Sequence, residues 1–176
     1  MRFELLTKSQ KALYREEILG MMRFSDKDFI PPLSARSSTT QKDLSGIRSV
    51  ENGIELYYSQ MEQQQILCVF EGETLLGFVS YRENYTCDQI TEDTFPNIYL
   101  STLIVKPEAR GKGLTRKMYE YLFWDQYRDR NIFTRTWSTN SAHIKILDGF
   151  GFTLIQRLEN DRGNGIDTVY FRKKPE

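Results

Sequence analysis

The chain of 176 residues is poor in the residues that build metal centres and disulfide frameworks. It contains one histidine, His143, and two cysteines, Cys68 and Cys87, which do not have a metal-binding spacing. A zinc site and a secreted, disulfide-stabilised scaffold are therefore both disfavoured. We expect no metal ion and a reduced, cytoplasmic protein.

Long apolar runs and an excess of one charge are also missing. No apolar stretch approaches the length of a membrane span, and the first residues become charged too soon for a signal peptide. Lys plus Arg equals Asp plus Glu at 24 each, so the net charge is zero. Non-specific nucleic-acid affinity comes from neutralising phosphates, which a balanced chain does poorly. We expect neither a membrane nor a nucleic-acid partner.

The spacing of apolar residues predicts one α/β domain over residues 1–176, with two helices in its N-terminal part. The first occupies residues 9–24, where Ser9 can cap the helix and Leu13 shares a face with Ile18. The second occupies residues 49–63. A Ser- and Thr-rich segment, 25–46, separates them and is longer than most connections in compact domains, which is typical of binding loops, lids or disorder.

Strand patterns dominate the rest of the chain. Two β-rich runs flank a Gly-containing turn as a hairpin, and the run Ile98–Val105 is apolar at nearly every position, which predicts a central strand buried on both faces. With the helix and strand that follow, this run predicts a β-α-β crossover. The expected elements are a strand at Phe3–Leu6, strands at Ile66–Phe70, Leu75–Tyr81 and Ile98–Val105, a helix at Gly113–Trp124, a strand at Ile132–Ser138, a helix at 140–151 and strands at 152–159 and 168–174.

The turn between the central strand and its helix has an unusual composition. Arg110, Gly111, Lys112 and Gly113 stand where the helix must begin. Helix N-termini attract anions through free N–H groups, and glycine lets those groups approach an anion closely. Lysine and arginine add charge, here including Arg116. The turn predicts a phosphate site, although a helix N-terminus with solvated basic residues has the same composition. Neither the P-loop nor the dinucleotide fingerprint fits its spacing.

The spacing that does fit is R-x-x-G-x-G/A, from Arg110 to Thr115, which resembles the acyl-CoA-binding motif of the GNAT (GCN5-related N-acetyltransferase) superfamily. Thr115 stands where Gly or Ala is usual. A second segment, 140–152, resembles the family's later motif through Asn140, Ile146 and the closing Gly-Phe pair. It departs at Leu147, where a tyrosine usually protonates the departing thiolate. The resemblance covers about residues 66–152.

The resemblance implies a mixed, mostly antiparallel twisted sheet with a central parallel β-α-β splay, flanked by helices. It implies acetyl-CoA as co-substrate and direct attack on it by a primary amine in a ternary complex. Pantetheine would bond the backbone of the central strand, the diphosphate would sit on the glycine turn, and Asn140 would cap its helix or bond the pantetheine arm. The implied cofactor-binding residues are Leu103, Ile104, Val105, Arg110, Gly111, Lys112, Gly113, Leu114, Thr115, Arg116 and Asn140.

The catalytic groups are less well defined by the resemblance. Relatives often place a carboxylate early in the central strand, whereas this chain offers Ser101 and no acid there. Glu83 after the hairpin is a candidate general base that would also attract a cationic amine; a water chain is an alternative. His143 is a further candidate, or simply a helix-surface or CoA-adjacent residue. Three further candidate bases precede the central strand: Asp88, Glu92 and Asp93. Without the usual tyrosine, another group or water protonates the sulfur, or catalysis is weak.

Two other functions remain compatible with the sequence. A non-catalytic acyl-CoA-binding module would also have Leu147 and a central strand without a carboxylate. A nucleic-acid-associated domain would also have the basic turn. For the enzyme, the acceptor is a small amine or a peptide amine. A homodimer through the C-terminal strands is compatible with either reading.

Overall fold

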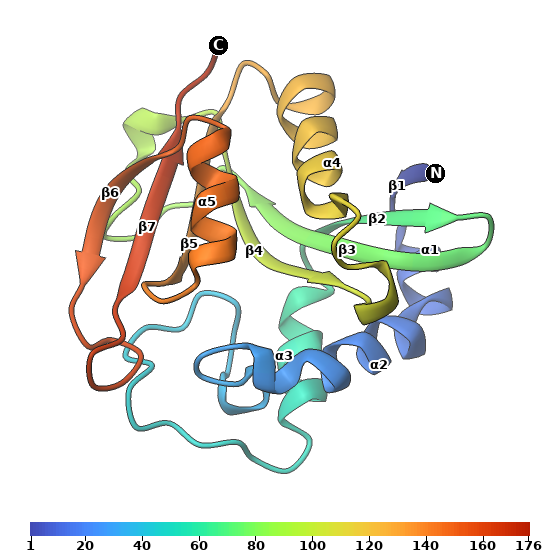
Figure 1. Ribbon diagram of the computed structural model, residues 1–176, viewed down its shortest axis with the longest axis horizontal. Coiled ribbons are helices and arrows are strands. Elements are labelled where there is room, and N and C mark those ends of the chain that lie inside the picture. The colour runs from blue at the N-terminus through green and yellow to red at the C-terminus, as the bar shows by residue number, and fades with distance from the viewer.

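The computed structural model describes residues 1–176 and contains one seven-stranded sheet (Figure 1). The strand order is β1-β2-β3-β4-β5-β7-β6, and every neighbouring pair is antiparallel except β4 and β5. The expected mixed sheet with one central parallel pair is confirmed. The strands are β1 Arg2–Leu5, β2 Gln65–Glu71, β3 Thr74–Glu83, β4 Asn97–Val105, β5 Asn131–Trp137, β6 Thr153–Leu158 and β7 Thr168–Lys173.

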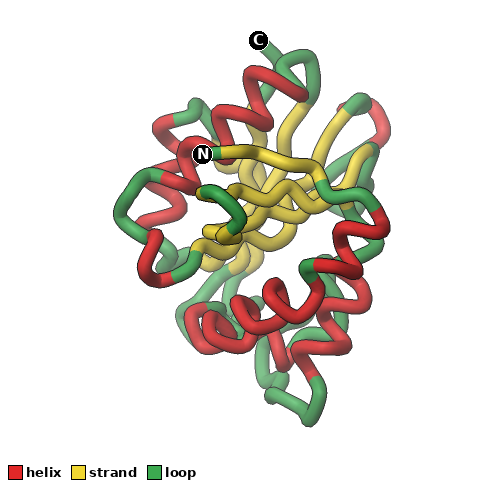
Figure 2. Tube along the Cα trace, turned by 90° about the vertical axis from the view of Figure 1, so that its right-hand side faces the viewer, coloured by secondary structure: helices red, strands yellow, loops and turns green.

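Helices cover both faces of the sheet (Figures 1 and 2). On one face, α4 and α5 pack on a core of 20 buried residues, and on the other, α2 and α3 pack on a core of 16. Because β4 contributes residues to both cores, its nearly continuous apolar sequence follows from burial on two faces. No helix is both long and apolar enough to cross a bilayer. The helices are α1 Lys8–Leu13, α2 Arg15–Ser25, α3 Gly53–Met61, α4 Leu114–Glu120 and α5 Ser141–Gly149.

The start of the first helix differs from the expectation. Thr7, and not Ser9, is the N-cap, because its hydroxyl accepts from the N–H of Gln10 while the Gln10 side chain bonds the N–H of Thr7. The helix then breaks at Tyr14 into α1 and α2, so that Leu13 is 75% exposed instead of sharing the buried face of Ile18.

The long segment between α2 and α3 folds against the rest of the domain. It contains two short 3-10 turns, Asp26–Asp28 and Leu33–Ala35, and it buries Leu33 and Arg36. Asp26 holds it in shape by accepting from the N–H and the hydroxyl of Ser34, at 2.8 and 2.7 Å.

The crossover helix is shorter in its α-form than expected. α4 ends at Glu120, and the chain continues as a π-helical turn over Tyr121–Gln126. Leu114, Met118 and Leu122 face the core together. α4 therefore runs back along β4 as a β-α-β crossover requires, and its first turn lies at the carboxyl end of that strand.

Candidate active site

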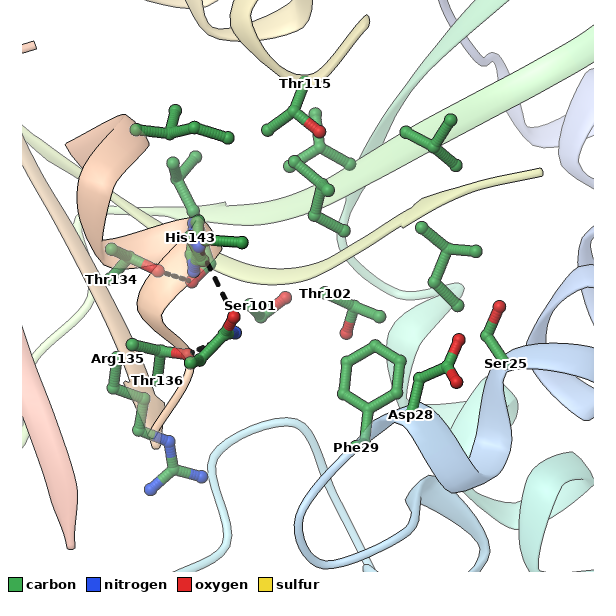
Figure 3. A pocket seen from close by; sticks show the side chains of 18 of the residues that line it. Ser25, Asp28, Phe29, Ser101, Thr102, Thr115, Thr134, Arg135, Thr136 and His143 are labelled. Carbon is green, nitrogen blue, oxygen red and sulfur yellow. Dashed lines mark hydrogen bonds between the residues drawn. The ribbon is translucent and has the colours of Figure 1, made fainter. Parts of the chain in front are cut away.

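The central parallel strands separate part-way along their length. Pairing between β4 and β5 joins Asn97–Leu100 to Asn131–Thr134 and goes no further. Beyond that point the two strands line a cavity of about 380 Å³, which the N-terminal part of α5 and the end of α2 also enclose (Figure 3). Leu103, Ile104 and Val105 all contribute to its wall. The edge of β4 that faces the cavity has no partner strand, so it is available to an extended ligand.

A β-bulge marks the inner end of this free edge. Ser80 of β3 pairs with Thr102, and Tyr81 pairs with Leu100, which leaves Ser101 without a partner. The hydroxyl of Ser101 is 2.9 Å from that of Ser80, and it also donates to the Gln64 side chain. Ser101 lines the cavity, but no carboxylate accepts its proton.

The glycine turn presents a row of unused donors. Six consecutive main-chain N–H groups, from Gly111 to Arg116, donate to no atom of the protein. Gly111 and Gly113 have φ of +74° and +71°, the left-handed region that favours glycine. A Cβ built on either residue would meet no atom within 4 Å, so the space beside the turn is open. This arrangement is suited to an anion with several oxygens, such as a diphosphate.

The cations of the turn make different contacts. Arg110 lines the cavity and ties the glycine turn to the 3-10 turn after α2, because its guanidinium is 2.9 Å from Asp28; it also donates to the carbonyl of Val105 at 3.1 Å. Lys112 is exposed and makes no ion pair. Arg116 lies over the ring of Phe150. Leu114 is buried in the core, so only its N–H can reach a ligand.

The start of α5 contributes Asn140 and His143 to the cavity. Asn140 is the N-cap: its side-chain oxygen accepts from the N–H of His143, and its amide donates to Thr136 at 3.0 Å. Its predicted cap is confirmed. Nε2 of His143 is 2.8 Å from the hydroxyl of Tyr119, which also lines the cavity. Burial lowers the pKa of His143 to about 4 and raises that of Tyr119, so the pair is uncharged at neutral pH.

Several expected residues lie elsewhere. Leu147 is fully buried in the core and does not line the cavity. Glu83, at the end of β3, is also outside it: its carboxylate pairs with Arg130 at 2.6 Å and accepts from Tyr127 at 3.0 Å. Asp88 pairs with Lys42, while Glu92 and Asp93 are exposed in a short 3-10 turn. No group of three or more His, Cys, Asp or Glu side chains could hold a metal ion.

Some cavity residues had no signal in the sequence. Phe29 enters from the segment between α2 and α3, and Arg135 and Trp137 enter from β5. Nothing local marked these three. Tyr119 was detectable, because it lies four residues after Thr115 and therefore on the same face of α4.

Comparison with known proteins identifies the family. Residues 41–152 match the family model described as the acetyltransferase (GNAT) family. This chain belongs to the GNAT acetyltransferase family. The family uses acetyl-CoA as its acyl donor, and the open strand edge and the free N–H groups fit that molecule. No curated protein matches the chain.

Solved structures share the GNAT fold over the whole chain at low identity. A ribosomal-protein-alanine N-acetyltransferase from Brucella melitensis has a TM-score of 0.68 and 16% identity, covering 99% of each chain. A protein from Salmonella typhimurium, assigned as an acetyltransferase and solved with acetyl-CoA, has a TM-score of 0.66 and 18% identity over 100% of this chain and 94% of its own. The ribosomal-protein-S18-alanine N-acetyltransferase from Escherichia coli has a TM-score of 0.59 and 13% identity over 97% and 91%.

Proposed function

We propose that this GNAT protein is an N-acetyltransferase that moves the acetyl group of acetyl-CoA to a primary amine by direct attack in a ternary complex. The observation that carries the proposal is one continuous cavity that begins beside the glycine turn at Arg110 and Thr115 and reaches the bulge at Ser101 and the wall at Trp137. One end suits the diphosphate arm of the donor. The other end leaves room for an acceptor.

The cavity wall supports direct transfer. Neither Cys68 nor Cys87 lines it, so no thiol is available to carry the acetyl group. In direct transfer the amine nitrogen bonds to the carbonyl carbon, the C–S bond breaks, the amine loses a proton and the CoA thiolate gains one. A main-chain N–H of β4 would stabilise the negative charge on the carbonyl oxygen.

The donor would be held by the residues around the splay. The backbone of Leu103, Ile104 and Val105 would bond the pantetheine amides as an added strand would. Asn140 would remain the cap of α5 and face the same arm. The N–H groups of 111–116 would bond the diphosphate, with Lys112 and Arg116 adding charge from outside.

Proton transfer has candidates on the wall. The hydroxyl of Tyr119, supported by His143, would protonate the thiolate, a role that Leu147 cannot take. A water chain past Ser101 and Gln64 would accept the proton of the amine. Glu83, held by Arg130, would act only through such a chain and from outside the cavity.

The test is turnover of acetyl-CoA with a panel of amines. The enzyme should release CoA thiol only when an amine is present, and the product should carry one added acetyl group by mass. The one structural feature that favours a non-catalytic acyl-CoA-binding module is the buried Leu147, which stands where a proton-donating tyrosine is usual. Tight acetyl-CoA binding with no amine-dependent release from any member of the panel would support that alternative.

A further inference from the structure

Three arginines gather at the acceptor side of the cavity without a carboxylate partner. Every hydrogen bond donated by Arg36, Arg135 and Arg162 ends on an uncharged oxygen. They come from distant parts of the chain: the segment before α3, strand β5 and the turn between β6 and β7. The fold therefore concentrates three positive charges in one place.

Two aromatic rings connect this cluster to the cavity. The guanidinium of Arg36 lies 5.6 Å from the ring centre of Phe29, and that of Arg162 lies 5.8 Å from Trp137. These two rings are 5.9 Å apart, and both line the cavity. Arg135 is itself a lining residue, and in Figure 3 its guanidinium points away from Ser101 and Thr115. In Figure 3, Arg135 and Phe29 lie on the opposite side of the cavity from Thr115, which follows the glycine turn.

The cluster of three arginines carries more positive charge than the two acids beside it, Asp26 and Asp161, can offset. Arg36 and Arg162 are only 7% and 5% exposed. The pKa of Arg162 is lowered to about 9, by burial first and then by the charges of Arg36 and Arg135. Neither acid pairs directly with an arginine, because Asp26 accepts from Ser34 and Asp161 accepts from Thr168. Buried cations with too little counter-charge are costly, so an anion at this end would relieve their remaining repulsion.

The cluster also retains donors for a ligand. Nη1 of Arg36, Nη2 of Arg162 and Nε of Arg135 donate to no protein atom. A guanidinium presents paired N–H groups that match the two oxygens of a carboxylate. The one carboxylate on the cavity wall, Asp28, is neutralised by Arg110. A polycationic acceptor would therefore meet net positive charge.

We propose that the acceptor is a small amine that also bears a carboxylate, and that Arg135, with Arg36 and Arg162 behind it, binds that carboxylate. The acceptor class is thus an amino acid or a compound of similar shape and charge. The two rings would pack on its apolar part. This inference rests on the proposed acetyl transfer to an amine and adds the chemical class of that amine.

The first experiment compares amino acids with their own carboxamides as acceptors, using acetyl-CoA and measuring CoA release. The acids should have the higher kcat/KM, by about 10- to 100-fold, the range for a hydrogen bond to a charged group. The amine of a carboxamide is the less basic of the pair, so intrinsic reactivity works against this result. Equal or faster turnover of the carboxamides would overturn the inference and leave acetyl transfer intact. Faster turnover of matched aminophosphonates would overturn the choice of a carboxylate.

A matched pair of variants separates ligand binding from packing. Arg135→Gln should raise KM for the acids by about 10-fold or more and leave KM for the carboxamides unchanged. Arg172→Gln is the control, because Arg172 also lies over a ring, that of Phe133 at 5.7 Å, but does not line the cavity. Arg172→Gln should leave KM unchanged for both the acids and the carboxamides. Equal losses for acids and carboxamides in Arg135→Gln would assign this residue to structure alone.

A binding measurement decides the inference even if no amine is turned over. N-acetylated amino acids and their carboxamides are compared for protection of the CoA-loaded protein against thermal unfolding. Stronger protection by the acids, lost in Arg135→Gln, supports the carboxylate site. Equal protection by acids and carboxamides contradicts it. Failure of turnover alone would instead count against the proposed function.

Discussion

The hydroxyl of Tyr119 on α4 lies 2.8 Å from Nε2 of His143 on α5, and the two side chains meet at the cavity wall. Tyr119 is the only tyrosine that lines the cavity. Because burial raises the pKa of Tyr119 and lowers that of His143, the phenol keeps its proton and the imidazole stays neutral. Under the proposed function, the phenol of Tyr119 would supply the proton that Leu147 cannot.

Tyr119→Phe should lower kcat for acetyl transfer by about 100-fold, the lower end for general acid catalysis. The change removes the hydroxyl and keeps the ring packed against Phe123 and Phe150. Acetyl-CoA affinity, measured by calorimetry, should stay unchanged. Tyr121→Phe is the matched control, since Tyr121 stacks on Phe3 and does not line the cavity. If both variants keep full activity, the thiolate takes its proton from another source.

His143 should make the protein acid-sensitive. Its folded-state pKa of about 4 lies below the ordinary 6.5, so between these values the unfolded chain binds a proton that the folded chain does not. Stability from this group is therefore complete above pH 6.5 and is lost as pH falls toward 4, by up to about 3 kcal/mol. Urea unfolding of the wild type and His143→Gln from pH 4.5 to 7.5 measures this. A pH dependence that is the same in both proteins would show that His143 is not the titrating group.

Glu83 is expected to contribute to stability more than to chemistry. Glu83→Ala removes the partner of Arg130 and Tyr127 and should lower the free energy of unfolding by about 1 kcal/mol, because the pair is partly exposed. The pH–rate profile and the acceptor KM should not change. A shifted profile in this variant would restore Glu83 as a general base acting through water.

Local chemistry explains why much of the site could be predicted from the sequence. The glycine turn could be predicted because its backbone conformation favours glycine, as at Gly111 and Gly113. Strand β4 could be predicted because a strand buried on both faces has a nearly continuous apolar sequence. Ser9 and Thr7 are both suitable caps by residue type, and only the reciprocal bond with Gln10 identifies Thr7 as the cap. The sequence could not reveal the break at Tyr14.

The proposed acceptor end of the cavity could not be predicted from the sequence, because it depends on contacts between distant residues. Arg36 and Arg162 are 126 positions apart, yet they bond the carbonyls of the neighbouring residues Pro31 and Ile30. No spacing or motif encodes that meeting, because tertiary packing alone brings the segments together. For the same reason, the sequence could not predict the ion pair of Glu83 with Arg130, which lies outside the cavity.

The most direct test of the account is calorimetric titration of CoA into wild type, Gly113→Ala and Gly46→Ala. Both glycines have φ of +71° and open space beside them, so the two changes carry the same backbone strain. The account predicts that Gly113→Ala weakens CoA binding by about 10-fold or more, because a methyl group displaces the diphosphate from the free N–H groups. Gly46→Ala should bind CoA as the wild type does, and Gly113→Ala should bind pantetheine as the wild type does. Unchanged CoA affinity in Gly113→Ala, with the variant folded, would contradict it.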